Sequence, residues 1–363
     1  MEGVAFTGSS GPPPTRSKYT KPPAAPVLRA TNLSSTSTVA TTTFAMNQGN
    51  IKHHEDLYFD DGNVALVVMS RSDDGDSEEH LVFRLHRSVL AKHSPVFKDM
   101  FTMPPAAGAE LYEGVPLVRM TDSASDLEAL LRALYNQPVF SIKSLDPDTP
   151  LRVKPLLLLA DKYDIQHLRT LIVKRLEDDW PRSLLQWDSL EADIAGRLES
   201  YRAHGLAGCE LEDDFPEPGS AIEVARQCNI PSILPAAFYN LSRLSIEFDW
   251  DNVRDPYSDP PEDWYSGTRS ARWSCIARED FVCLLQGRAR LAKYLDEELR
   301  PPYPSHHAKG VCKLVEWDDY CAKSTRHVEG LCMTCTLCIS DQIEKLRGEI
   351  WRRIPTFFRL VQD

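Results

Sequence analysis

The alternation of apolar and polar positions predicts short strands in the first half of the chain, with helices between and after them. Residues 64–69 and 81–85 are apolar runs on either side of a polar segment at 70–80, a pattern typical of a β-hairpin. The run at 115–120 predicts a further strand. The helix after it is predicted from leucines that share one helical face at i, i+3, i+4 and i+7: Leu127, Leu130, Leu131 and Leu134. Asp122 or Ser123 can cap this helix.

Two short helices are predicted over residues 86–101, between the second and third of these strands. Ser94 can cap the second helix, and Pro95 suits its first position, where a backbone N–H would have no partner. The charged positions are assigned to solvent and the apolar ones to the buried faces. Those apolar positions are Val89, Leu90, Val96, Phe97, Met100 and Phe101.

A helical hairpin is predicted from residues 156–163 and 165–178, turning at Asp164, whose carboxylate can cap the second helix. Its pattern returns later in the chain. The positions Ala160, Asp164, Ile165 and Leu168 correspond to Ala225, Asn229, Ile230 and Ile233. A second helical hairpin is therefore predicted over residues 220–246.

The chain of 363 residues is long enough for two folded regions, and we predict the α+β fold class, mostly α. Residues 1–50 are dominated by Ser, Thr, Pro and Gly, which predicts a disordered tail. Residues 55–180 are expected to form one domain of short strands and helices. Residues 185–363 are expected to be a helical region with a Cys-rich end, with helices over 278–299 and 337–351.

The composition indicates which class of partner and which cellular compartment to expect. The net charge of −12, from 41 Lys and Arg against 53 Asp and Glu, disfavours nucleic acid and leaves proteins as the expected partners. No apolar run reaches the ~18 residues of a membrane-spanning helix, so no membrane contact is expected. Nine cysteines, an odd number, are typical of free thiols or a metal site in a reducing compartment. The protein is therefore expected to be cytoplasmic or nuclear.

A specific signature lies between residues 83 and 101. It consists of Phe83, His86, Leu90, Ser94, Phe97 and Phe101. In this order and spacing the chain resembles the BTB/POZ domain family. Further agreement is found at residues 118–120, 130–135 and 157–168. The wider sequence, with Trp317 and the late cysteines, is similar to BTB proteins common in mushroom-forming fungi, the basidiomycetes.

The resemblance implies a non-enzymatic adaptor that forms a homodimer or a heterodimer through this domain, with a cullin scaffold of a ubiquitin ligase as a candidate partner. Interfaces depend on a few large side chains. The candidate interaction residues are Met100, Phe101, Met103, Leu111 and Glu113. Leu111 and Glu113 correspond to a hydrophobic-x-Glu element of cullin-recruiting members. The chain departs from the family pattern at two places. Many members have Asp at the position of Asn63, and the loop at 70–80 is longer than usual.

Two alternatives are a transcriptional co-regulator, which the family also contains, and a zinc-dependent protein that uses the late cysteines. The cysteines of the second are Cys332, Cys335 and Cys338, preceded by Cys312 and Cys321, with His306, His307 and His327 nearby. Zinc takes four such ligands, but three thiols at this spacing also suit one buried helix face. Both interpretations stay open, so the metal is left unknown. No other cofactor is expected.

No enzyme is expected either, because the common motifs of hydrolases and nucleotide-binding enzymes are absent from the sequence. His86 is interpreted as a buried, hydrogen-bonded core histidine, because no acid, Ser or Cys partner stands near it in the sequence. His53 and His54, at the end of the predicted tail, are expected to be solvated.

Overall fold

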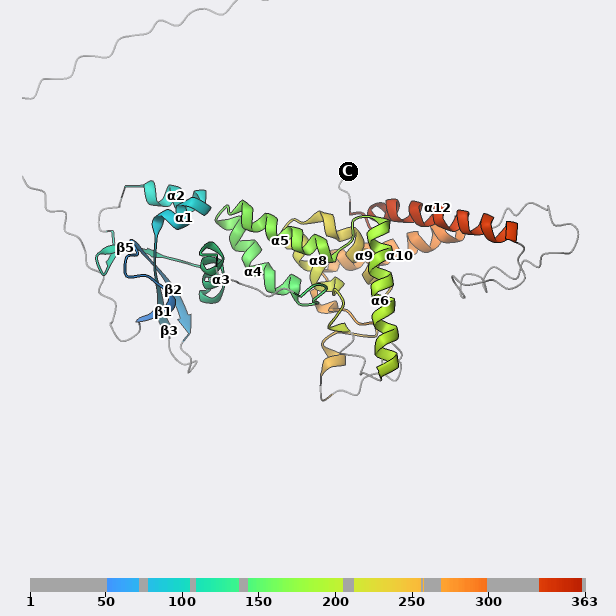
Figure 1. Ribbon diagram of the computed structural model, residues 1–363, viewed down its shortest axis with the longest axis horizontal. Helices are drawn as coiled ribbons and strands as arrows, with labels where there is room; N and C mark the ends of the chain where they lie inside the picture. The colour runs from blue at the N-terminus through green and yellow to red at the C-terminus, as the bar shows by residue number, and fades with distance from the viewer. Residues whose placement is uncertain are drawn as a thin grey trace, which may run out of the picture. The chain divides into compact units, whose positions relative to one another are not determined.

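The computed structural model describes residues 51–71, 78–104, 109–136, 143–204, 212–255, 257, 269–298 and 333–360. The tail predicted over residues 1–50 lies outside these ranges. The described part is α+β and mostly helical, as the sequence predicts, with the strands near its start (Figure 1).

The sheet has five strands in the order β1-β3-β2-β5-β4. They are β1 (Ile51–Tyr58), β2 (Val64–Arg71), β3 (Glu78–Leu85), β4 (Leu111–Tyr112) and β5 (Val115–Arg119). β2 and β3 pair antiparallel, with Val64 opposite Leu85, and this confirms the predicted hairpin. Both strands run further than expected into the polar segment at 70–80, because their backbones continue the ladder past the apolar residues.

Side chains of β2 alternate between two cores, as the pleat of a strand requires. One set belongs to the main core shared with the helices: Val64, Leu66 and Val68. The other set forms a separate cluster together with Val82 of β3: Ala65 and Val67. Tyr58 and Tyr112 pack against that second cluster, so aromatic side chains cover the sheet face that the helices leave.

The sequence does not predict β1. Only His54 and Leu57 are buried along this strand, so it lacks strict alternation. Its pairing with β3 also shifts in register between His53 and Tyr58. β1 begins at Ile51, four positions before the domain start expected at residue 55.

Three helices pack with the sheet: α1 (Arg87–His93), α2 (Pro95–Thr102) and α3 (Ala124–Leu134). Ser94 caps α2, since its Oγ accepts the backbone N–H of Phe97 at 3.1 Å. Ser123, rather than Asp122, caps α3. The predicted leucine face of α3 is fully buried, which confirms that helix.

Two helical pairs follow, and the second repeats the first. The pairs are α4 (Thr149–Lys162) with α5 (Gln166–Asp179), and α8 (Pro218–Gln227) with α9 (Leu234–Ser242). α4 begins earlier than predicted because Pro150 suits a first helical turn. A short 3-10 helix, Pro231–Ile233, leads into α9. The predicted recurrence of the hairpin is confirmed, although the expected cap by Asp164 is wrong: its carboxylate accepts from the side chain of Gln166.

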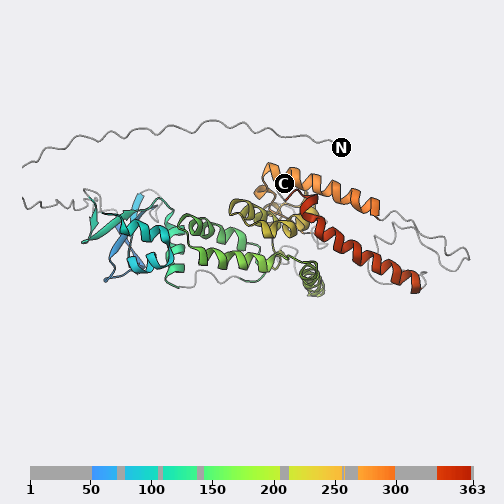
Figure 2. The same ribbon diagram turned by 90° about the horizontal axis from the view of Figure 1, so that it is seen from above.

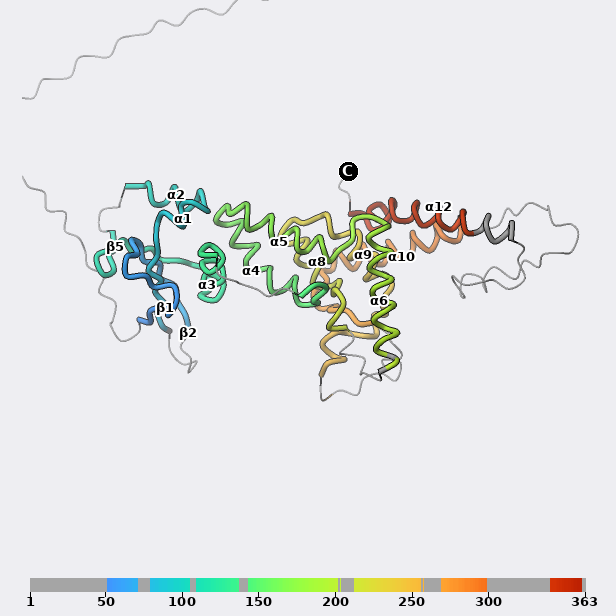
Figure 3. The backbone as a smooth tube through the Cα atoms, in the orientation of Figure 1, coloured from blue at the N-terminus to red at the C-terminus, as the bar shows by residue number. Residues whose placement is uncertain are grey.

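Side chains join the two pairs where α4 and α8 contact each other. Lys154 Nζ of α4 lies 2.7 Å from Glu223 Oε1 of α8. Arg169 of α5 donates to the Cys228 carbonyl at 2.7 Å, where the end of α8 leaves carbonyl groups without helical partners. Figure 3 follows the chain through these consecutive pairs.

Three longer helices complete the described part: α6 (Leu184–His204), α10 (Arg278–Glu298) and α12 (Met333–Phe357). α10 ends one residue before its predicted limit, and α12 is longer at both ends than predicted. Figure 2 shows α10 and α12 converging near the end of α12, where the rings of Tyr294 and Phe357 lie 5.5 Å apart. None of the described helices is long and apolar enough to span a membrane.

Residues 248–255 form an irregular segment with a short 3-10 helix, Asn252–Arg254, and residues 256 and 258–268 lie outside the described ranges. Phe248, Trp250 and Val253 are buried. This segment therefore packs closely although it is irregular.

Candidate interaction surface

Helix α2 is fixed by its inner face. Phe97 is fully buried and stacks on Tyr163, with ring centres 4.6 Å apart. Ser94 Oγ donates to the Tyr163 carbonyl at 2.6 Å, so the residue that caps α2 also ties it to the end of α4. Burial, with a hydrogen bond to Asp122, raises the pKa of Tyr163 above its usual range, so the ring stays a neutral phenol.

Three apolar side chains lie on α2 and at the C-cap residue that follows it: Val96, Met100 and Met103, which we term the α2 stripe. Val96 is 40% exposed and Met103 is 63% exposed. Met100 is half-buried against the main core. The sequence-based assignment of Val96 to the buried face is therefore wrong, because the helix turns its neighbour Phe97 inward instead.

The side chain of Phe101 is less exposed than that of Met103. Its ring is half-buried, and the guanidinium of Arg87 lies 5.0 Å from the ring centre. The same guanidinium donates a hydrogen bond to the Phe101 carbonyl. A cation held against an aromatic face stabilises that face in place. Arg87 therefore holds the Phe101 ring in place.

Leu111 and Glu113 lie on the β4–β5 hairpin. Glu113 and Gly114 form its turn with φ values of 46° and 81°, the left-handed pair that a two-residue hairpin turn requires. Glu113 Oε2 accepts from Tyr58 Oη at 2.6 Å and lies 3.4 Å from Arg84 Nη1. Burial and this hydrogen bond raise the pKa of Tyr58. The Glu113 carboxylate is half-exposed and already engaged by β1 and β3.

The two groups of predicted residues are separate. Met100 and Phe101 belong to α2 and Met103 is its C-cap residue, whereas Leu111 and Glu113 belong to the hairpin. Within the described ranges, no hydrogen bond, ion pair or ring contact joins the two groups. They therefore offer two contact regions rather than one site.

His54 is buried, so the expectation that it is solvated is wrong. Its Nδ1 accepts the backbone N–H groups of Asp56 and Leu57 at 3.1 Å each. Its Nε2 lies 3.2 Å from Glu128 Oε1 of α3. Although burial acts to raise it, hydrogen bonds from Arg132 and His54 hold the pKa of Glu128 below its usual value. These contacts attach β1 to α3.

His53 is exposed, as predicted, and its ring also contacts two tyrosines. Its ring stacks on Tyr58 with centres 4.1 Å apart, and its Nε2 lies 2.6 Å from Tyr112 Oη. The two tyrosines are those that cover the second face of the sheet. The sequence did not predict the contacts of either histidine because it did not predict β1.

His86 is hydrogen-bonded, as predicted, but only half-buried. Its backbone N–H donates to Tyr135 Oη at 3.0 Å, and its Nδ1 lies 3.1 Å from the same oxygen. Its Nε2 lies 3.1 Å from the exposed carboxylate of Asp61. Sequence reasoning missed this acid because 24 residues separate the two positions in the chain, and the β2–β3 hairpin between them brings the two together.

Residues 76–179 match the BTB/POZ domain family. This segment is a BTB/POZ domain. The match runs from β3 to the end of α5 and therefore includes both contact regions. A comparison of the chain with curated proteins gives no match.

Asn63, the predicted departure from the family pattern, has a structural role beside the BTB/POZ segment. Its Oδ1 accepts the backbone N–H of Arg87 at 2.7 Å and so caps α1. An amide oxygen serves this purpose as well as a carboxylate does. The substitution removes a negative charge and keeps the cap.

Most of the candidate zinc ligands lie outside the described ranges. Cys312, Cys321, Cys332, His306, His307 and His327 all lie there. Cys335 and Cys338 fall on α12. Among the described residues no three His, Cys, Asp or Glu side chains gather as metal ligands would. The zinc site therefore stays a prediction.

The described cysteines that can be placed are free thiols: Cys228, Cys275 and Cys283. Burial, with Glu223 as hydrogen-bond partner, raises the pKa of Cys275 to about 12. Cys275 is thus a neutral thiol near pH 7, which suits packing and not nucleophilic attack.

Proposed function

We propose that the protein is a non-enzymatic adaptor whose BTB/POZ domain pairs two copies of the chain while the helical half holds a second protein. One observation carries the proposal: the BTB/POZ match at residues 76–179, since these domains are generally protein-interaction modules. The exposed α2 stripe lies within this segment. Closed two-fold pairs are the commonest soluble assemblies.

Tethering is the proposed mechanism. Two partners on one chain meet at a raised local concentration, which needs no catalytic group. The α2 stripe supplies apolar anchors, because Val96 and Met103 leave a large part of their surface exposed. The net charge of −12 favours protein partners over nucleic acid, and the odd count of cysteines favours the cytoplasm or nucleus. The resemblance of the wider sequence to BTB proteins of mushroom-forming fungi supports a basidiomycete source.

We also propose that the BTB/POZ domain binds a cullin scaffold, in addition to a second copy of the chain. The β4–β5 hairpin supports this through Leu111 and the half-exposed Glu113. A scaffold that contacts Glu113 would compete with Tyr58 and Arg84 for its carboxylate. Glu113→Gln should then weaken recovery of the scaffold and leave pairing of the chain unchanged.

Affinity capture followed by mass spectrometry tests the proposal. The intact chain is compared with the double variant Val96→Glu/Met103→Glu, which charges the α2 stripe. Leu171→Glu is the control, since Leu171 is 66% exposed on α5, outside the stripe. We expect the control to recover the same proteins as the parent and the double variant to lose some of them. Equal recovery by all three would overturn the role of the stripe.

A further inference from the structure

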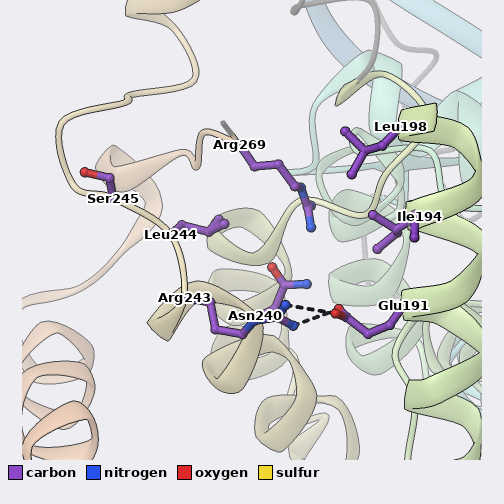
Figure 4. Close-up of a pocket in the computed structure, with 9 residues that line it drawn as sticks. Glu191, Ile194, Leu198, Asn240, Arg243, Leu244, Ser245 and Arg269 are labelled. Atoms are coloured by element: carbon purple, nitrogen blue, oxygen red, sulfur yellow. Dashed lines mark hydrogen bonds and ion pairs between the residues drawn. The ribbon is translucent and has the colours of Figure 1, made fainter. Parts of the chain in front are cut away.

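A cavity of about 350 Å³ lies in the helical half of the chain, lined by residues of α6, by residues of α9 and the segment that follows it, and by Arg269. Its size falls within the range of small-ligand pockets. Figure 4 shows the Arg269 guanidinium and the Asn240 amide pointing toward each other across it, with Ile194 and Leu198 projecting from α6. The BTB/POZ match ends before these residues.

Two buried polar atoms of this cavity have no hydrogen-bond partner among the described residues: Asn240 Oδ1 and Arg269 Nε. Asn240 is 2% exposed. Arg269 as a whole is half-buried, but its Nε is closed to solvent. A buried donor or acceptor without a partner is unfavourable, so a ligand that hydrogen-bonds to these side chains is favoured in the cavity.

The cavity also holds an arginine without a matching carboxylate. Arg243, at the rim, is bound by both oxygens of Glu191, at 2.7 and 2.8 Å. Arg269 has no such ion pair within the described ranges. Its guanidinium donates to the Pro216 carbonyl at 3.1 Å and lies 5.2 Å from the ring centre of Phe215. Burial lowers the pKa of Arg269, which means that the site disfavours the isolated cation.

Apolar side chains form most of the remaining wall, with Ser245 beside them. Ile194 is 7% exposed, and Leu198 and Leu244 are half-buried. All three line the cavity. An occupant therefore needs an anionic acceptor for Arg269, a donor for Asn240 and a compact apolar body between them.

We propose that this cavity binds the carboxyl terminus of a partner peptide that ends in an apolar residue. The terminal carboxylate accepts from the Arg269 guanidinium, the amide N–H of the last residue donates to the Asn240 side chain, and the terminal side chain packs on Ile194 and Leu198. A peptide end carries these three groups in this order. The proposal rests on the adaptor function in one respect: the peptide would belong to the protein that the helical half holds.

Calorimetric titration of the full chain tests the site. The probes are N-acetyl-L-leucine and a tetrapeptide ending in leucine, each as the free acid and as the amide. We expect saturable binding of both acids, and affinity lower by about tenfold or more for both amides, because the charge-assisted bond to Arg269 is lost. Binding of N-acetyl-L-leucine without binding of the peptide would assign the cavity to small free acids and overturn the peptide source.

Two variants locate the binding. Arg269→Met removes the guanidinium and keeps the length of the side chain, with the exposed Arg278→Met on α10 as its charge-matched control. Ala195→Trp fills the cavity from an exposed position of α6. If Arg269→Met does not fold, this variant still tests whether the probes bind in the cavity. We expect both to abolish binding and the control to retain it.

Three results would each overturn the proposal. Binding could survive Ala195→Trp, the acids and amides could bind with equal affinity, or the cavity could hold water alone and take no probe. A chain that is monomeric and captures no partner would defeat the adaptor function. That outcome would leave the titration result unchanged, so the two failures are distinguishable.

Discussion

Asp164 and Asn229 hold the same left-handed backbone conformation, with φ of 50° and 51°, each at the turn of one helical pair. The next residue bonds back to the helix in both cases: Ile165 N–H to the Ala160 carbonyl at 2.7 Å, and Ile230 N–H to that of Ala225 at 2.8 Å. This is the Schellman arrangement, in which short polar residues or glycine are favoured. The repeat seen in the sequence is thus a repeat of turn chemistry.

Asn229→Ala should lower the free energy of unfolding by about 1 kcal/mol, because alanine tolerates a positive φ poorly. Asn229→Gly should keep the parental stability, since glycine adopts this conformation without strain. Urea unfolding of both variants measures the difference. Equal losses in the two variants would contradict a backbone origin.

Phe97→Ala should destabilise the protein by about 3–5 kcal/mol, the usual cost of emptying a buried aromatic position. The reason is its complete burial and its stacking on Tyr163. Val96→Ala on the same helix is the control and should change stability by about 0.5 kcal/mol or less, because Val96 is 40% exposed. Thermal melting compares them, and similar shifts would mean that the helix faces the other way.

The sequence predicts elements whose signals are local and misses those that depend on distant partners. Ser94 and Pro95 mark the start of α2, and the leucines of α3 share one face, so both helices could be predicted. α6 had a usable signal in Trp187, Leu190 and Ile194, which share a buried face after the capping residue Ser183. β1 had none, since few of its residues are buried.

The contact regions and the cavity were harder to predict. Nothing near Val96 in the sequence tells whether it or Phe97 faces the core, because Tyr163 decides this from the end of α4. Ile194, Asn240 and Arg269 meet only through tertiary packing. The match to a BTB/POZ domain at 76–179 agrees with the family predicted from the signature residues.

Gly287 on α10 is required by the ring of Phe358. A Cβ added at Gly287 would lie 2.0 Å from Phe358 Cδ1. Gly287→Ala should therefore destabilise the protein by about 1–3 kcal/mol, despite the better helix propensity of alanine. Gly348→Ala on α12 is the control: its added Cβ meets nothing within 4 Å, so it should keep or raise stability. Equal melting temperatures for the two variants would argue against this contact.

The contact of Glu128 with Arg132 and His54 predicts a pH-dependent contribution to stability. The folded protein holds the pKa of Glu128 below its ordinary 4.5, so this contribution is present above pH 4.5. It is lost as the pH falls through the lower folded value. Glu128→Gln should therefore be less stable than the parent near neutrality, and the difference should shrink on acidification. A difference independent of pH would show that the carboxylate charge is not its source.

Self-association of the BTB/POZ domain is the central claim, and light scattering on the intact chain at tens of micromolar measures it most directly. The account predicts twice the mass of one chain for the parent and for Leu171→Glu, and a single-chain mass for Val96→Glu/Met103→Glu. A single-chain mass for the parent, unchanged by concentration, would contradict it.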